Sequence, residues 1–143
     1  MGTIKVHIQP PDTGLCGQYA VANLIRCSPE KSIAAFGKPG GNKRKTGTQT
    51  KDVAEAMKKL GYKSDLRMTL IQPDTILPDL CIIAVGWFGP PIGSGLKRSV
   101  AAHWVAHRKG KILCSGYGLC KDLKTYTKKN NGYASGYIEV KKM

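Results

Sequence analysis

A nearly unbroken apolar run over residues 80–87 constrains the fold of this chain more than any other segment. An uncharged run of this length is typical of a strand that is buried on both faces. Two alternating segments follow at 100–108 and 111–117, and the Lys-Gly pair between them predicts a two-residue hairpin turn, with Cys114 opposite Val105. Alternation also predicts strands over residues 3–9, 62–70 and 135–141.

Helical patterns fill much of the chain before the apolar run. Residues 16–27 are apolar on most sides, which predicts a buried central helix. Ser28, followed by proline, predicts the start of a second helix that ends near Gly37. Residues 51–60 form an amphipathic pattern that would end at Gly61. Because helices come first and strands afterwards, the sequence predicts an α+β fold.

The size and the cysteine content predict a single domain without a disulfide framework. The chain has 143 residues, 41% of them hydrophobic, so residues 1–143 can bury one core. Its five cysteines are an odd number at irregular spacing, and no export signal is evident. No apolar stretch approaches the ~20 residues of a membrane span. These features predict a cytoplasmic protein.

The formal net charge of +14 favours encounter with acidic partners. Nucleic acid, an anionic membrane surface and an acidic protein all fit that charge, and so does a plain basic surface without a partner. Lysines gather in a glycine-containing loop over residues 38–51 and in the segment from Lys121 to Lys129. No motif that reads nucleic-acid bases accompanies them, so the charge by itself does not select the partner.

One cysteine occupies the place of a nucleophile. Cys16 follows the turn-rich segment 10–14 and opens the first helix, where the helix dipole favours a thiolate. His103 opens a distant strand and would take the thiol proton and return it to the leaving group. Gln9 lies before the turn, and its amide would stabilise an oxyanion together with the backbone N–H of Cys16. Gln18 is a poorer alternative donor.

Each of these residues also has a purely structural interpretation. Alone, Cys16 would be a buried thiol, His103 a core histidine and Gln9 a solvated loop residue. The catalytic interpretation depends on all three occurring in the right order on the right kinds of element. His107 and Cys114 raise the question of a zinc site with His103, but the pattern lacks a fourth ligand. We therefore expect no metal and no cofactor.

The chain resembles the papain-like cysteine peptidases, especially the small double-glycine leader peptidases and their stand-alone relatives. These families begin with a glutamine, a short loop, then Cys-Gly and a small-residue helix, as Gln9 and Cys16-Gly17 do here. Their histidine strand has a His-aromatic-Val pattern, matched by His103-Trp104-Val105. The resemblance spans most of the chain. It implies a papain-like fold in which the helix that carries the cysteine packs on an antiparallel sheet that carries the histidine.

The resemblance also implies a residue that orients the histidine. Members of these families usually have Asp, or Asn in papain, on the strand after the histidine, often as Asp-Pro. Here Ser115-Gly116 stands in that place, so the orienting group is missing or replaced. Ser115, a backbone carbonyl or Asp122 would substitute for it. Without a carboxylate, catalysis should be weaker or tuned to one substrate.

The expected function is therefore acyl transfer of the cysteine-peptidase kind, with hydrolysis of a peptide or isopeptide bond through a thioester at Cys16. The substrate would be a protein or peptide, and the catalytic candidates are Cys16, His103, Gln9 and Ser115. Deamidation or transamidation would use the same acyl-enzyme. The alternative is a catalytically weak or inactive papain-like fold that acts as a basic binding module for nucleic acid or an acidic protein.

Overall fold

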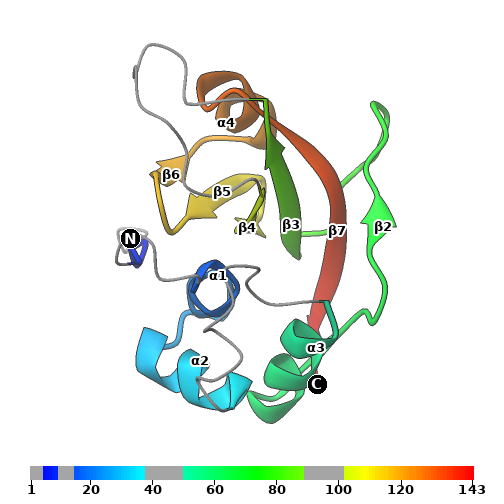
Figure 1. The fold of residues 1–143 in the computed structure, drawn as a ribbon. Helices are drawn as coiled ribbons and strands as arrows, with labels where there is room; N and C mark the ends of the chain where they lie inside the picture. The colour runs from blue at the N-terminus through cyan, green and yellow to red at the C-terminus, as the bar shows by residue number, and fades with distance from the viewer. Residues whose placement is uncertain (1–4, 10–14, 38–49, 89–101) are drawn as a thin grey trace.

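The computed structural model describes residues 5–9, 15–37, 50–88 and 102–143. Three helices from the first part of the chain gather on one side of a sheet built mainly from the second part (Figure 1): α1 (Cys16–Ile25), α2 (Pro29–Phe36) and α3 (Thr50–Lys59). The predicted α+β class is confirmed, and α1 packs against the sheet as expected. None of the helices in the described part of the chain is long and apolar enough to cross a bilayer.

Within the described residues, seven strands form one antiparallel sheet. They are β1 (Tyr62–Ser64), β2 (Thr69–Leu70), β3 (Leu80–Trp87), β4 (Ala102–Arg108), β5 (Lys111–Cys114), β6 (Gly118–Cys120) and β7 (Gly132–Lys142). The strand order is β1-β7-β3-β4-β5-β6, and β2 pairs with β7 beside this path. The last strand in the sequence, β7, therefore pairs with one edge of β3, and β4 pairs with the other edge of β3.

Strand β3 is buried on both faces, as its composition predicted. Ile82 belongs to the core cluster that contains Val21 of α1 and Met57 of α3. Ile83 and its neighbours on the opposite face belong to a second cluster, which contains Tyr126 of α4 (Leu123–Lys129). Successive residues of a strand face opposite sides, so one strand serves both clusters.

The hairpin between β4 and β5 has the predicted turn and register. Lys109 and Gly110 have φ angles of 48° and 89°, and a two-residue turn of this hand requires positive φ at both positions. Ala106 lies opposite Leu113, the register expected for this turn. In that register Cys114, the last residue of β5, lies beside the first half of β4.

The predicted helix ends are close to the observed ones. Helix α2 begins at the Ser28 cap, whose hydroxyl accepts the Lys31 N–H at 3.1 Å, and ends at Gly37. Helix α1 ends two residues earlier than expected, because Arg26 adopts a left-handed conformation with φ 61°. Gly61, with φ 90°, follows α3 as predicted.

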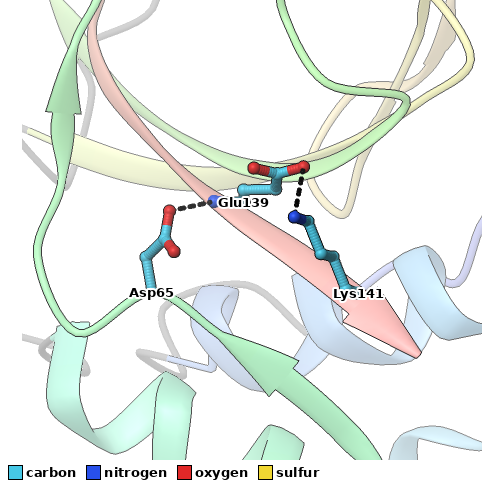
Figure 2. A network of polar contacts seen from close by, with 3 residues as sticks. All are labelled: Asp65, Glu139 and Lys141. Atoms are coloured by element: carbon cyan, nitrogen blue, oxygen red, sulfur yellow. Dashed lines mark hydrogen bonds and ion pairs between the residues drawn. The ribbon is translucent and has the colours of Figure 1, made fainter. Parts of the chain in front are cut away.

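The segment 62–70, predicted as one strand, is interrupted at Asp65. The Asp65 N–H donates to the Glu139 carbonyl at 3.1 Å, and its carboxylate accepts the Glu139 N–H at 3.2 Å. Lys141 forms an ion pair with Glu139 at 3.9 Å on the same strand, β7 (Figure 2). Because the Asp65 carboxylate replaces a backbone partner, the ladder between β1 and β7 stops there, and β2 joins β7 again further along.

The N-terminal segment also differs from the prediction. Residues 5–9 are not a strand, because their backbone bonds go to the Asn23 side chain and to Ser115. Residues 3–4 of that expected strand, the turn 10–14 and residues 38–49 of the expected basic loop lie outside the described residues.

Helix α4 and strand β6 were not predicted. Asp122 caps α4 by accepting the Thr125 N–H at 2.7 Å, and Tyr126 is the buried residue of the helix. The strand expected over 111–117 ends at Cys114, where the chain turns into β6.

Candidate active site

The thiol of Cys16 lies at the N-terminal end of α1. Leu15 precedes the helix and accepts the Tyr19 N–H at 3.0 Å, and its side chain makes no capping bond. The first N–H groups of a helix have no partner inside it. The amides of Cys16 and Gly17 are among them, and both interact with the Cys16 thiol.

Helix α1 is fixed along β4 at both of its ends. At the C-terminal end, the guanidinium of Arg108 donates to the Leu24 carbonyl at 2.8 Å. At the other end, the Cys16 thiol interacts with the backbone N–H of Trp104. Trp104 directly follows His103, so this packing brings the predicted nucleophile to the part of β4 that carries the predicted base.

Burial is the largest influence on the Cys16 thiol, and it raises the thiol's pKa above the ordinary value. The N–H groups of Trp104 and Gly17 act to lower the pKa, whereas the nearby Cys114 acts to raise it. Because burial outweighs the donors at the helix end, it opposes the thiolate that the helix position favours. Reaction at Cys16 therefore needs a base close by.

His103 is held on two sides. It pairs with Val85 across β3 and β4. Its Nε2 lies 3.4 Å from Sγ of Cys114, and its ring centroid lies 6.0 Å from that of Trp87 at an interplanar angle of 32°. A sulfur on the ring edge and an indole beside the ring restrict how the imidazole can turn.

The Trp87 ring has its place because Gly132 faces it across β3 and β7. A Cβ at Gly132 would lie 2.7 Å from the indole, closer than any real contact of that kind. The indole also packs against Tyr117 and Tyr126, with ring centroids 6.0 and 6.2 Å away. The indole that lies beside His103 is therefore itself held by two tyrosine rings.

Gln9 is held by Ser115. The Gln9 N–H donates to the Ser115 carbonyl at 2.9 Å, and the Ser115 hydroxyl donates to Oε1 of Gln9. These bonds orient the amide with its oxygen toward Ser115, so Nε2 is the end that can serve an oxyanion. Ser115 follows Cys114, the residue that contacts His103.

The segment that carries Gln9 is also tied to α1. Oδ1 of Asn23 accepts the His7 N–H at 2.7 Å, and Nδ2 of Asn23 donates to the His7 carbonyl at 3.2 Å. Asn23 is buried, so its amide replaces the strand partner that the backbone of His7 would otherwise need. These bonds fix the backbone two residues before Gln9.

The structure separates the residues that were candidates for orienting His103. Ser115 lies with Gln9, and Asp122 accepts the Thr125 N–H at the start of α4. The contact to the imidazole edge comes from Cys114. The sulfur of Cys114 in turn lies 3.1 Å from the Tyr126 hydroxyl.

The contacts of Cys114 with His103 and with Tyr126 were not predicted from the sequence. The hairpin register already placed Cys114 beside β4, which was the available signal. Asp122 followed by apolar and aromatic residues was a signal for α4, but the lysines of that segment favoured the interpretation of a basic surface. The role of Asn23 had no signal in the sequence.

His107 and Cys81 lie away from His103, further along β3 and β4. His107 is buried opposite Cys81, and desolvation lowers the pKa of its imidazole. Burial also raises the pKa of Cys81 to about 12. Within the described ranges, no three His, Cys, Asp or Glu side chains are grouped to hold a metal ion. The five cysteines, all within those ranges, form no disulfide.

A scan against protein-family models and a search of curated proteins returned no match to this chain. Its function is therefore inferred from the arrangement of Cys16, His103 and Gln9. A thiol at a helix end, an imidazole on the strand beside it and an oriented amide can together support nucleophilic attack on a carbonyl carbon.

Proposed function

We propose that this chain is a papain-like thiol enzyme that transfers acyl groups from peptide or isopeptide bonds through a thioester at Cys16. One observation supports this above the others: Cys114 and Ser115, which are adjacent in sequence, contact His103 and Gln9 respectively. The thiol of Cys16 meets the same strand at Trp104. These contacts connect the three segments that carry the proposed nucleophile, base and oxyanion donor, which supports the proposal.

In the proposed reaction His103 accepts the proton of the Cys16 thiol while the sulfur attacks the substrate carbonyl carbon. The negative charge on the tetrahedral oxygen is stabilised by the backbone N–H of Cys16 and by Nε2 of Gln9. His103 then gives the proton to the leaving amine, and a thioester remains. Water, activated by His103, hydrolyses the thioester and restores the thiol.

The identity of the leaving and accepting groups decides the overall reaction. Loss of a peptide amine followed by attack of water is hydrolysis, which is the default. Loss of ammonia from a side-chain amide would be deamidation, and attack by a second amine would be transamidation. All three pass through the same thioester, so the proposal concerns the acyl-enzyme.

Thiol reactivity tests the proposal without a known substrate. The protein is exposed briefly to iodoacetamide between pH 5 and 9, and each cysteine is followed by mass spectrometry. Cys16 should be modified faster than Cys27, a half-buried thiol whose pKa is also raised by burial. His103→Ala should remove this advantage, because the thiol then ionises without a neighbouring base.

A second measurement tests acyl transfer itself. The probe p-nitrophenyl acetate should acetylate Cys16, and Gln9→Ala should slow this step about 100-fold through loss of an oxyanion donor. Alkylation by iodoacetamide creates no oxyanion, so the same variant should leave it unchanged. Equal, slow labelling of Cys16 and Cys27 in the wild type would contradict the proposal.

The alternative function, a basic binding module, is supported by one feature of α4. A groove along this helix is lined by Lys124, Thr125, Lys128 and Lys129. Together with the net charge of +14, these lysines suit an anionic partner such as nucleic acid or an acidic protein.

Binding of a fluorescent oligonucleotide at several salt concentrations tests this alternative. Phosphate contacts predict an affinity that falls steeply as salt rises and is reduced in Lys124→Ala/Lys128→Ala. Cys16→Ala should bind as well as the wild type, because this function does not use the thiol. Undetectable or salt-independent binding would exclude a phosphate-binding role for the groove.

A further inference from the structure

We propose that Cys114, supported by Tyr126, is the positioning residue of His103. In other thiol–imidazole sites this role belongs to a carboxylate or amide side chain. The inference rests on the proposed function, because it assigns the group that holds the proposed general base.

The sulfur of Cys114 is buried and surrounded by hydrogen-bonding groups. Nε2 of His103 lies 3.4 Å away, the Tyr126 hydroxyl 3.1 Å away and the Gly116 N–H 3.4 Å away. The side chain of Cys114 has no exposed surface. Buried structural cysteines usually pack against apolar atoms, whereas this sulfur has three polar partners.

The donors around Cys114 favour a role as acceptor. A backbone N–H can only donate, so the Gly116 amide uses the sulfur as an acceptor. The Tyr126 hydroxyl can accept the S–H proton, which leaves the sulfur lone pairs to His103 and Gly116. In that arrangement Nε2–H of His103 donates to Cys114, and Nδ1 is the ring nitrogen that takes up a proton.

The same observations separate Cys114 from the nucleophile. A substrate carbonyl cannot reach a sulfur without exposed surface, whereas Cys16, at the N-terminal end of α1, is only half-buried. The Tyr126 hydroxyl lies 3.1 Å from the same sulfur and helps to hold it in place. Cys114 therefore acts through His103 and does not meet the substrate.

A neutral thiol differs from a carboxylate in one respect that can be measured. It fixes the direction of the imidazole but supplies no negative charge to stabilise the imidazolium. Among the described titratable groups, Cys114 of β5 contacts His103 and Tyr126 of α4 contacts that sulfur, while the Cys16 thiol of α1 meets the neighbouring residue Trp104. Replacing the thiol by a carboxylate in Cys114→Asp should thus move the titration midpoint of His103 to higher pH.

Nuclear magnetic resonance of the His103 ring tests the inference directly. In the wild type the Nε2–H proton should be visible and protected from exchange with water. Cys114→Ala should lose this signal and slow alkylation of Cys16 by iodoacetamide about 10-fold at pH 7. The near-isosteric Cys114→Ser should retain the signal, and Tyr126→Phe should weaken it.

Cys81→Ala is the matched control. Cys81 belongs to the same core cluster and is equally buried, but it lies opposite His107 on β4. This variant should leave the His103 signal, its titration and the alkylation of Cys16 unchanged. Urea unfolding of both alanine variants measures the loss of stability caused by the cavity that each substitution leaves.

Two results would overturn the inference: a wild-type His103 with its proton on Nδ1, or a Cys114→Ala protein whose ring signal, titration and alkylation match the wild type. Failure of the proposed function looks different. If Cys16 of the wild type is no more reactive than Cys27 but the His103 ring still responds to Cys114→Ala and Cys114→Asp, the contact stands and the enzymatic role falls.

Discussion

Ser115 binds both the backbone and the side chain of Gln9. Its carbonyl accepts the Gln9 N–H at 2.9 Å, and its hydroxyl donates to the Gln9 side-chain oxygen. Ser115 itself is buried. The preceding residue, Cys114, contacts His103. The end of β5 therefore supports the proposed oxyanion donor and the proposed base through adjacent residues.

Ser115→Ala should impair acylation without impairing the thiol. Loss of the hydroxyl releases the Gln9 amide from its orientation, so acetylation of Cys16 by p-nitrophenyl acetate should slow about 10-fold. The effect should be smaller than that of Gln9→Ala, because the donor is displaced and not removed. Alkylation by iodoacetamide should be unchanged, and equal slowing of both reactions would show that Ser115 acts on the thiol or on His103.

Asn23→Ala should detach the segment that carries Gln9. The His7 N–H and carbonyl lose their partners, and the free energy of unfolding should fall by about 1–3 kcal/mol in urea titrations. Acetylation of Cys16 should slow as in Ser115→Ala. Asn23→Asp keeps the acceptor for the His7 N–H but not the donor, so it should be intermediate; a variant as stable as wild type would contradict this role.

Gly132→Ala should push the Trp87 indole off its place beside His103. The added Cβ overlaps the ring, which should cost about 1–3 kcal/mol of stability and shift the tryptophan fluorescence. In a Trp87→Leu background the same substitution should cost less, because only the clash with the Gly86 carbonyl oxygen, 2.9 Å from the added Cβ, remains. Equal costs in the two backgrounds would mean that Trp87 does not depend on Gly132.

The lowered pKa of His107 predicts that the protein loses stability in mild acid. Desolvation lowers the pKa of its imidazole in the native state, so below its ordinary value of about 6.5 the unfolded chain binds the proton more readily than the folded chain. The free energy of unfolding should therefore fall as the pH drops below about 6.5, by at most about 1.4 kcal/mol per pH unit for one proton. The fall should level off below the native pKa.

Urea unfolding of the wild type and His107→Gln between pH 5 and 8 measures this contribution. The variant should lose the slope between pH 6.5 and the native pKa. His7→Gln, at a half-buried position on the N-terminal segment, is the control. Parallel profiles for the wild type and His107→Gln would assign the acid sensitivity to other groups.

Much of the secondary structure follows from local sequence. The apolar run at 80–87 is β3 to the residue, the Lys109–Gly110 turn sets the register of the next two strands, and Ser28 caps α2. Periodicity, turn conformation and capping act within a few residues of each other, so they can be recognised without tertiary contacts. Helix α4 was missed because charged surface residues masked its short buried face.

The sequence by itself determined that Cys16 opens a helix and that His103 opens a strand of an antiparallel hairpin. Only the tertiary structure decided the state and the partners of these groups. Burial between α1 and β4 raises the pKa of the Cys16 thiol against the effect of the helix end. Ser115 binds Gln9, which is 106 residues away in the sequence. Cys114 contacts His103. Desolvation and long-range contacts depend on how distant segments pack, and no local pattern encodes that packing.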